Sequence, residues 1–130
     1  MNSDSRKTLA VMFTDIAGFT RHMERDEAGA LAMISIIRKH LVPLLGSSGG
    51  TLIKEMGDGT LSVFEDPRAA VRCSIRLQEK LKDCGFKLRI GIHRGTVHLS
   101  PGDVLGDTVN VASRLEKMAP PGVSAYRGKH

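Results

Sequence analysis

The segment Phe13–Thr20, FTDIAGFT, combines residue types that can bind a metal–polyphosphate. The apolar run Leu9–Phe13 is typical of a buried strand, which would carry Asp15 out at its C-terminal end. Ala17 and Gly18 are small and allow another group to approach the backbone closely. A carboxylate binds a divalent cation, and backbone N–H groups bind phosphate. The pattern indicates a metal–phosphate site, although an acid after a strand more often serves as a turn or cap residue.

A second acid, Asp58, lies in the turn Gly57-Asp58-Gly59 between two short predicted strands. Aspartate is common in turns for structural reasons alone. In a ferredoxin-like sheet, however, this hairpin lies beside the first strand, so Asp58 would approach Asp15. Two converging carboxylates repel each other and favour a cation between them. A pair of cations is a common device for displacement at phosphorus.

Four further polar residues could bind a nucleotide. Asn110 and Arg114 share one face of a predicted helix at 107–118, where an amide can orient a ribose and a guanidinium can stabilise phosphoryl charge. Lys54 and Asp103 match the edge of adenine, because a lysine donates to N1 and a carboxylate accepts from the 6-amino group. Guanine presents the reverse pattern at those atoms. All four residues are also compatible with an ordinary solvated surface.

The elements that must position these residues alternate along the chain. Strands are expected at 7–13, 51–56, 60–64, 86–92 and 97–99, and helices at 26–45, from Asp66-Pro67 onward and at 107–118. Pro43 leaves the end of the first helix open by a few residues. The order β-α-β-β-α-β is typical of an α+β ferredoxin-like sandwich, with an antiparallel sheet and the helices on one face.

Length and composition limit the function classes. A chain of 130 residues is expected to form a single domain, 1–130, with its core at about 7–123. The net charge is +5, but the basic residues are scattered and aromatic residues make up only 4%, so we expect no nucleic-acid partner. The polar N-terminus and the lack of a long apolar run predict no signal peptide or membrane segment. Cys73 and Cys84 are expected to be reduced thiols in a cytoplasmic protein.

The chain resembles the class III nucleotidyl cyclase catalytic domains. Four segments follow one another in the family's order: FTDIAGFT at 13–20, GGTLIKEMGDGTLSVF at 49–64, LRIGIHRG at 88–95 and GDVLGDTVNVASRL at 102–115. The resemblance implies that Asp15 and Asp58, together with Ile16, bind two Mg²⁺ or Mn²⁺ ions per site. It also implies a substrate-binding segment made of Ile16, Ala17, Gly18, Phe19 and Thr20.

The same resemblance implies that Lys54 and Asp103 select adenine, that Asn110 orients the ribose and that Arg114 stabilises the transition state. The implied reaction converts ATP to 3′,5′-cyclic AMP and pyrophosphate at two sites shared head to tail in a homodimer. A fused or separate sensor domain is an expected partner. Family domains usually continue with further strands after the last helix, so this domain is expected to be C-terminally short.

Two other functions remain open from the sequence. One is a nucleotide-binding regulatory module of cyclase fold with weak or no turnover. The other is a guanylate cyclase, although that group typically has Glu and Cys where this chain has Lys54 and Asp103.

Overall fold

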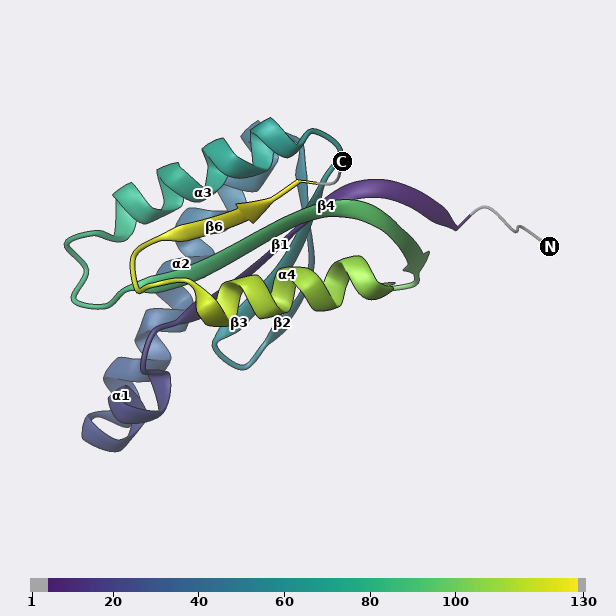
Figure 1. Cartoon of the computed structure of the whole chain (residues 1–130). Coiled ribbons are helices and arrows are strands. Elements are labelled where there is room, and N and C mark those ends of the chain that lie inside the picture. Colours follow the sequence, from purple (N-terminus) through teal and green to yellow (C-terminus); the bar gives the residue numbers. More distant parts are fainter. Residues whose placement is uncertain (1–4, 129–130) are drawn as a thin grey trace.

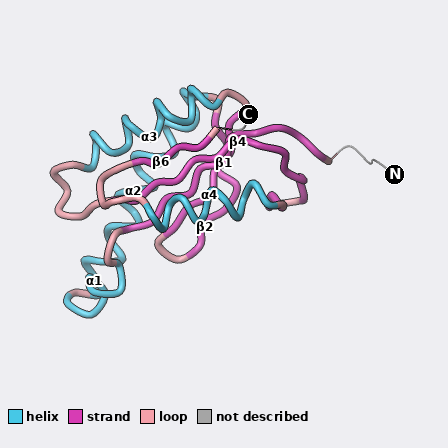
Figure 2. Tube along the Cα trace, viewed as in Figure 1, coloured by secondary structure: helices cyan, strands magenta, loops and turns pink. Residues whose placement is uncertain are grey.

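The computed structural model describes residues 5–128 (Figures 1 and 2). In chain order the elements are β1 (Arg6–Ile16), α1 (Phe19–Arg25), α2 (Glu27–Ser48), β2 (Gly50–Met56), β3 (Gly59–Phe64), α3 (Pro67–Leu81), β4 (Leu88–Ser100), β5 (Asp103–Leu105), α4 (Asp107–Met118) and β6 (Ser124–Arg127).

One sheet organises the fold. Its strand order is β2-β3-β1-β4-β5, with β6 also paired to β4. β1 lies at the centre and is antiparallel to both β3 and β4. This arrangement confirms the predicted α+β sandwich. The sequence pattern did not indicate β6, which follows the last helix and pairs with β4 in parallel.

The two faces of the sheet carry separate apolar clusters. Ala10 and Met12 of β1 pack with residues of α2 and α3, whereas Leu9 and Val11 pack with Ala112 of α4. Because successive residues of a strand point to opposite faces, α4 lies across the sheet from α2 and α3. Figure 1 shows α4 in front of the sheet and α2 behind it. The prediction that all helices cover one face is therefore wrong for α4.

Helix α4 lies unusually close to strand β4. A β-carbon built on Gly91 would lie 2.5 Å from the carbonyl oxygen of Ala112, and one built on Gly95 would lie 2.5 Å from Thr108 Oγ1. The Thr108 hydroxyl donates to the carbonyl oxygen of Thr96 at 2.7 Å. The absence of side chains at these two glycines is what lets the helix backbone rest on the strand.

Three elements differ from the predicted ones. β4 is one long strand instead of two, because β1 pairs with it from Arg6 opposite His98 to Ile16 opposite Leu88. The region before the long helix forms a separate short helix, α1. Helix α2 continues through Pro43, which is exposed, so the backbone group that loses its partner can be solvated.

Helix α2 is long and apolar enough, by length and composition alone, to cross a membrane. This finding corrects the expectation that no segment approaches that length. In this structure Ile37, Leu41, Leu44 and Leu45 of the same helix are buried, and all four belong to the core cluster on the sheet. The core helix of a globular domain passes the same test.

We predict that Gly91→Ala destabilises the domain by about 1–3 kcal/mol, because the added methyl group must push α4 away from β4. Urea unfolding measures the change. Gly46→Ala is the matched control, since Gly46 lies inside α2 and its β-carbon would meet nothing within 4 Å. That substitution should stabilise the domain by about 0.5–1 kcal/mol. Equal effects at the two glycines would contradict the close packing of α4.

Candidate active site

The carboxylate of Asp58 lies beside the end of β1, where Asp15 is located. Residues Gly57 and Asp58 form the two-residue turn between β2 and β3, with a positive φ of 61° at Gly57. Asp58 Oδ2 accepts the backbone N–H of Ile16 at 2.9 Å. A β-carbon built on Gly59 would lie 3.9 Å from the Asp15 β-carbon. The predicted approach of the hairpin to the first strand is confirmed.

The two aspartates suit a cation that is also bound by a phosphate-bearing ligand. Asp15 Oδ1 is buried and has no hydrogen-bond partner, so its lone pairs could coordinate a cation. Within residues 5–128, no three His, Cys, Asp or Glu side chains gather into a metal-ligand group. Mg²⁺ is commonly held by only one or two carboxylates plus substrate phosphates. The donor set therefore fits Mg²⁺ or Mn²⁺ in company with a nucleotide.

The loop after β1 uses part of its backbone internally. The N–H of Ile16 donates to Asp58, and the N–H of Ala17 donates to the carbonyl oxygen of Lys87 at 2.8 Å. These two amides are therefore not available for phosphate, contrary to the expectation for the whole segment. The Ile16 side chain is buried in the core, so this residue can reach a metal only through its carbonyl oxygen.

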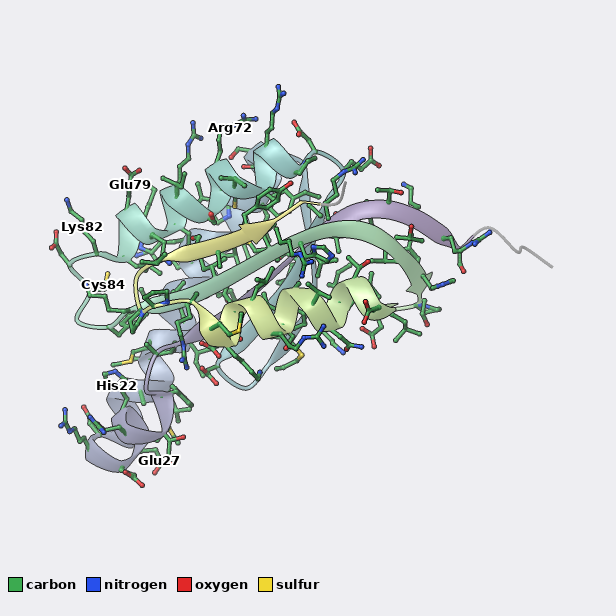
Figure 3. The ribbon with its side chains drawn as sticks, viewed as in Figure 1. His22, Glu27, Arg72, Glu79, Lys82 and Cys84 are labelled. Carbon is green, nitrogen blue, oxygen red and sulfur yellow. The ribbon has the colours of Figure 1, made fainter. Side chains whose placement is uncertain are left out.

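Beyond Ala17 the chain turns sharply and opens toward solvent. Gly18 has a φ of 66°, which favours glycine, and it directs the chain into α1, where Phe19 is the first residue. An open hollow of about 680 Å³ lies here, lined by Ala17, Gly18, Thr20, Arg21, His22, Glu24 and Arg25. Figure 3 shows His22 on the part of the molecule that projects beyond the sheet. Arg21 and Arg25 give this hollow cationic groups.

A second open groove, of about 520 Å³, contains the two predicted base-reading residues. Lys54, Asp103 and Asn110 all line it. Lys54 Nζ lies 3.1 Å from Asp103 Oδ1, and the two side chains are about one third exposed. The hydrogen bond from Lys54, aided by the N–H of Val104, lowers the pKa of Asp103 below its ordinary value. The groove therefore presents an ammonium and a carboxylate side by side.

A β-bulge directs Lys54 into this groove. The pairing of β2 with β3 shifts between Leu52, opposite Ser62, and Lys54, opposite Leu61. Leu52 packs with the cluster under α2, whereas Leu61 belongs to the cluster under α4. Without the extra residue, Lys54 would point to the same face as Leu52. The bulge thus brings Lys54 to the face that carries Asp103.

Helix α4 holds Asn110 and Arg114 away from its own sheet. Its buried positions are Thr108, Ala112 and Glu116, one helical turn apart, and Asn110 and Arg114 are exposed. Asn110 lines the groove that contains Lys54, and Arg114 is not among its lining residues. The structure thus collects the predicted residues in separate places on one chain and does not surround a single cavity with all six.

Two residues that the sequence pattern did not single out lie beside Asp15. Arg89 is its direct partner across β1 and β4, with Nε 3.5 Å from Asp15 Oδ1. Glu116 Oε2 lies 3.9 Å from the same Nε. Burial raises the pKa of Glu116 to about 8, and the nearby Asp15 acts in the same direction. The sequence contained one indication of the role of Glu116: it follows Thr108 and Ala112 at helical spacing, so it falls on the buried face of the helix, where an apolar residue would be expected.

A comparison with known families gives a direct result. The family model described as the adenylate and guanylate cyclase catalytic domain matches residues 1–124. The chain belongs to this family. Its fold agrees with that assignment, because the adenylate/guanylate cyclase/hydrolase from Silicibacter pomeroyi superposes with a TM-score of 0.80 at 35% identity. That match covers 93% of this chain and 75% of the other.

Curated relatives of this cyclase domain include two proteins named adenylate cyclase. The one from Streptomyces coelicolor is 39% identical over 88% of this chain, and the one from Streptomyces griseus is 36% identical over 85%. This chain spans 31% and 28% of their respective lengths. The relatives are thus considerably longer than the cyclase domain described here.

The raised pKa of Glu116 predicts a pH dependence of stability. Between the ordinary glutamate value of 4.5 and about 8, the folded state holds the proton more tightly than the unfolded state. The free energy of unfolding should therefore fall as the pH rises through this range. Urea unfolding at several pH values with EDTA present measures it. Glu116→Gln stays neutral and should lose this part of the slope; an unchanged slope would show that Glu116 titrates normally.

Proposed function

We propose that this cyclase domain is an adenylate cyclase that converts ATP to 3′,5′-cyclic AMP and pyrophosphate. The observation that carries the proposal is the pair Lys54–Asp103, held 3.1 Å apart in an open groove that Asn110 also lines. The names of the two Streptomyces relatives support the same substrate.

The pair has the chemistry to distinguish the two purine bases. The Lys54 ammonium is a donor only, and the ionised Asp103 carboxylate is an acceptor only. The lowered pKa of Asp103 keeps it an acceptor at neutral pH. Adenine supplies an acceptor at N1 and a donor at its 6-amino group, whereas guanine offers the reverse. A guanine placed here would leave both side chains without a suitable partner. A site with such unpaired polar groups rejects the wrong base more strongly than an apolar pocket of the same size would.

In the proposed reaction the ribose 3′-hydroxyl loses its proton to solvent, and its oxygen forms a bond to the α-phosphorus as the bond to the pyrophosphate oxygen breaks. Asp15 and Asp58 would hold two Mg²⁺ or Mn²⁺ ions per site. When bound, such ions activate the attacking oxygen and neutralise phosphate charge. The segment from Gly18 to Thr20 would face the phosphates. Asn110 would orient the ribose, and the guanidinium of Arg114 would stabilise the charge that develops during transfer.

The site is proposed to form between two copies of this chain. The metal-binding aspartates and the groove with Lys54 lie in different places on one chain, and Arg114 is exposed on a helix face that points away from its own sheet. A two-fold head-to-tail dimer would let each protomer complete the other, giving two equivalent sites. A fused or separate sensor domain is the proposed further partner of this domain. A cytoplasmic location is proposed as well, in keeping with ATP as substrate.

Mixing two inactive variants tests both the reaction and the shared site. With Mg²⁺ or Mn²⁺ present, Asp58→Ala and Arg114→Ala should each lower the rate of cyclic AMP formation at least about 10²–10³-fold. Their mixture should recover activity, since each mixed dimer keeps one intact site. Chromatography of cyclic AMP gives the readout, and differently tagged chains verify that mixed dimers form. Mixed dimers without activity would contradict the shared site, and near wild-type activity in either variant would contradict its proposed role.

Substrate preference tests the base-reading pair. The wild-type domain should prefer ATP to GTP, and Lys54→Glu with Asp103→Ser should erode that preference mainly by lowering ATP turnover. The substitutions remove the hydrogen bonds to adenine directly, whereas efficient GTP turnover would also require a pocket shaped for guanine. Relative kcat/KM for the two nucleotides is the measurement. Lys7→Glu is the control, because Lys7 lies outside the groove and pairs with Glu65. An unchanged preference for ATP over GTP in the double variant would show that Lys54 and Asp103 do not read the base.

A further inference from the structure

Beside the proposed metal site, three ionisable side chains share an incomplete set of contacts. Asp15 Oδ1, Arg89 Nε and Glu116 Oε2 are all buried, and none of them has a hydrogen-bond partner. Arg89 Nε nevertheless lies 3.5 Å from Asp15 and 3.9 Å from Glu116. The guanidinium is therefore within reach of two acids without a well-formed bond to either. Buried polar atoms normally have partners, so this cluster calls for an explanation.

The position of Glu116 is unfavourable for a purely structural residue. Its side chain is only 4% exposed, and burial of a carboxyl group is costly. It also lies in the last turn of α4, where the helix dipole disfavours an acid. The close approach of α4 at Gly91 is what brings Glu116 down to the strand, because a β-carbon there would contact the Glu116 backbone nitrogen. The fold thus places an acid beside Arg89 at some cost.

From this geometry we propose that Arg89 is the resident counter-ion of Asp15, and that Glu116 is the alternative hydrogen-bond acceptor for the Arg89 guanidinium. Without a divalent cation, Arg89 balances the Asp15 carboxylate. When a cation binds Asp15, the guanidinium moves toward Glu116, which is already within 4 Å. Arg89 and Glu116 are positioning residues that set the affinity of Asp15 for the metal. This inference rests on the proposed metal-binding role of Asp15.

The two residues should affect metal binding in opposite directions. Arg89 places a positive charge next to the ligand and competes with the cation, so its removal should strengthen binding. Glu116 can accept a hydrogen bond from the displaced guanidinium, so the removal of its carboxyl group should weaken binding. If the cluster served only to hold the fold together, both substitutions would lower stability and neither would tighten metal binding. The sign of the change therefore separates the two roles.

Direct Mn²⁺ binding, measured by electron paramagnetic resonance of the purified full chain without nucleotide, tests the proposal. Arg89→Met should lower the Kd for Mn²⁺ by about tenfold, and Glu116→Met, which removes the acceptor, should raise it several-fold. Arg94→Met, on the same strand, is the control and should bind like the wild type, because Arg94 is opposite Ala10 and makes no ion pair among residues 5–128. Thermal unfolding checks each variant, and Arg89→Gln replaces Arg89→Met if the latter does not fold.

The outcomes separate this inference from the proposed function. Unchanged or weaker Mn²⁺ binding in a folded Arg89→Met or Arg89→Gln variant overturns the counter-ion role. If Asp15→Asn abolishes Mn²⁺ binding in the same experiment, the proposed metal-binding role of Asp15 still stands. Binding that is unaffected by Asp15→Asn overturns the metal site and this inference together.

Discussion

The close packing of α4 on β4 determines which side chains of the helix can take part in the site. Gly91 and Gly95 remove the side chains that would hold the helix at an ordinary distance. As a result, the helix face with Thr108, Ala112 and Glu116 is pressed against the sheet, and the opposite face is presented outward. The close packing of α4 on β4 therefore has two consequences. It buries an acid, Glu116, beside Arg89 and Asp15, and it leaves Asn110 and Arg114 exposed on the outer face of the helix.

Much of the sheet follows from local sequence patterns. The apolar run before Asp15 and the two-residue turn at Gly57 and Asp58 are local features, so the strand and the hairpin were predictable, as was the approach of Asp58 to β1. The N-cap of α3 is similar, since the Asp66 side chain accepts from Arg68 N–H at 2.9 Å. The resemblance to cyclases, together with the chemistry of the two side chains, suggested the proposed roles of Lys54 and Asp103, and the structure adds their contact.

Other features depend on long-range packing that a single sequence does not reveal. Nothing local in α4 states which face of the sheet it covers, and an amphipathic helix fits either face. The roles of Arg89 and Glu116 depend on that choice and on the register of β1 against β4. Likewise, the amides of Ile16 and Ala17 looked free in the sequence because their partners, Asp58 and Lys87, are distant in the chain.

The bulge in β2 has a consequence for the comparison of related cyclases. Side-chain direction alternates along a strand, and the shift between Leu52 and Lys54 reverses that alternation for the residues that follow. A relative without the additional residue would turn the equivalent of Lys54 toward α2, whatever its amino-acid type. An ungapped alignment could then pair two lysines that face opposite sides of the sheet. Substrate preference inferred from residue identity at this position is valid only when the strand carries the same bulge.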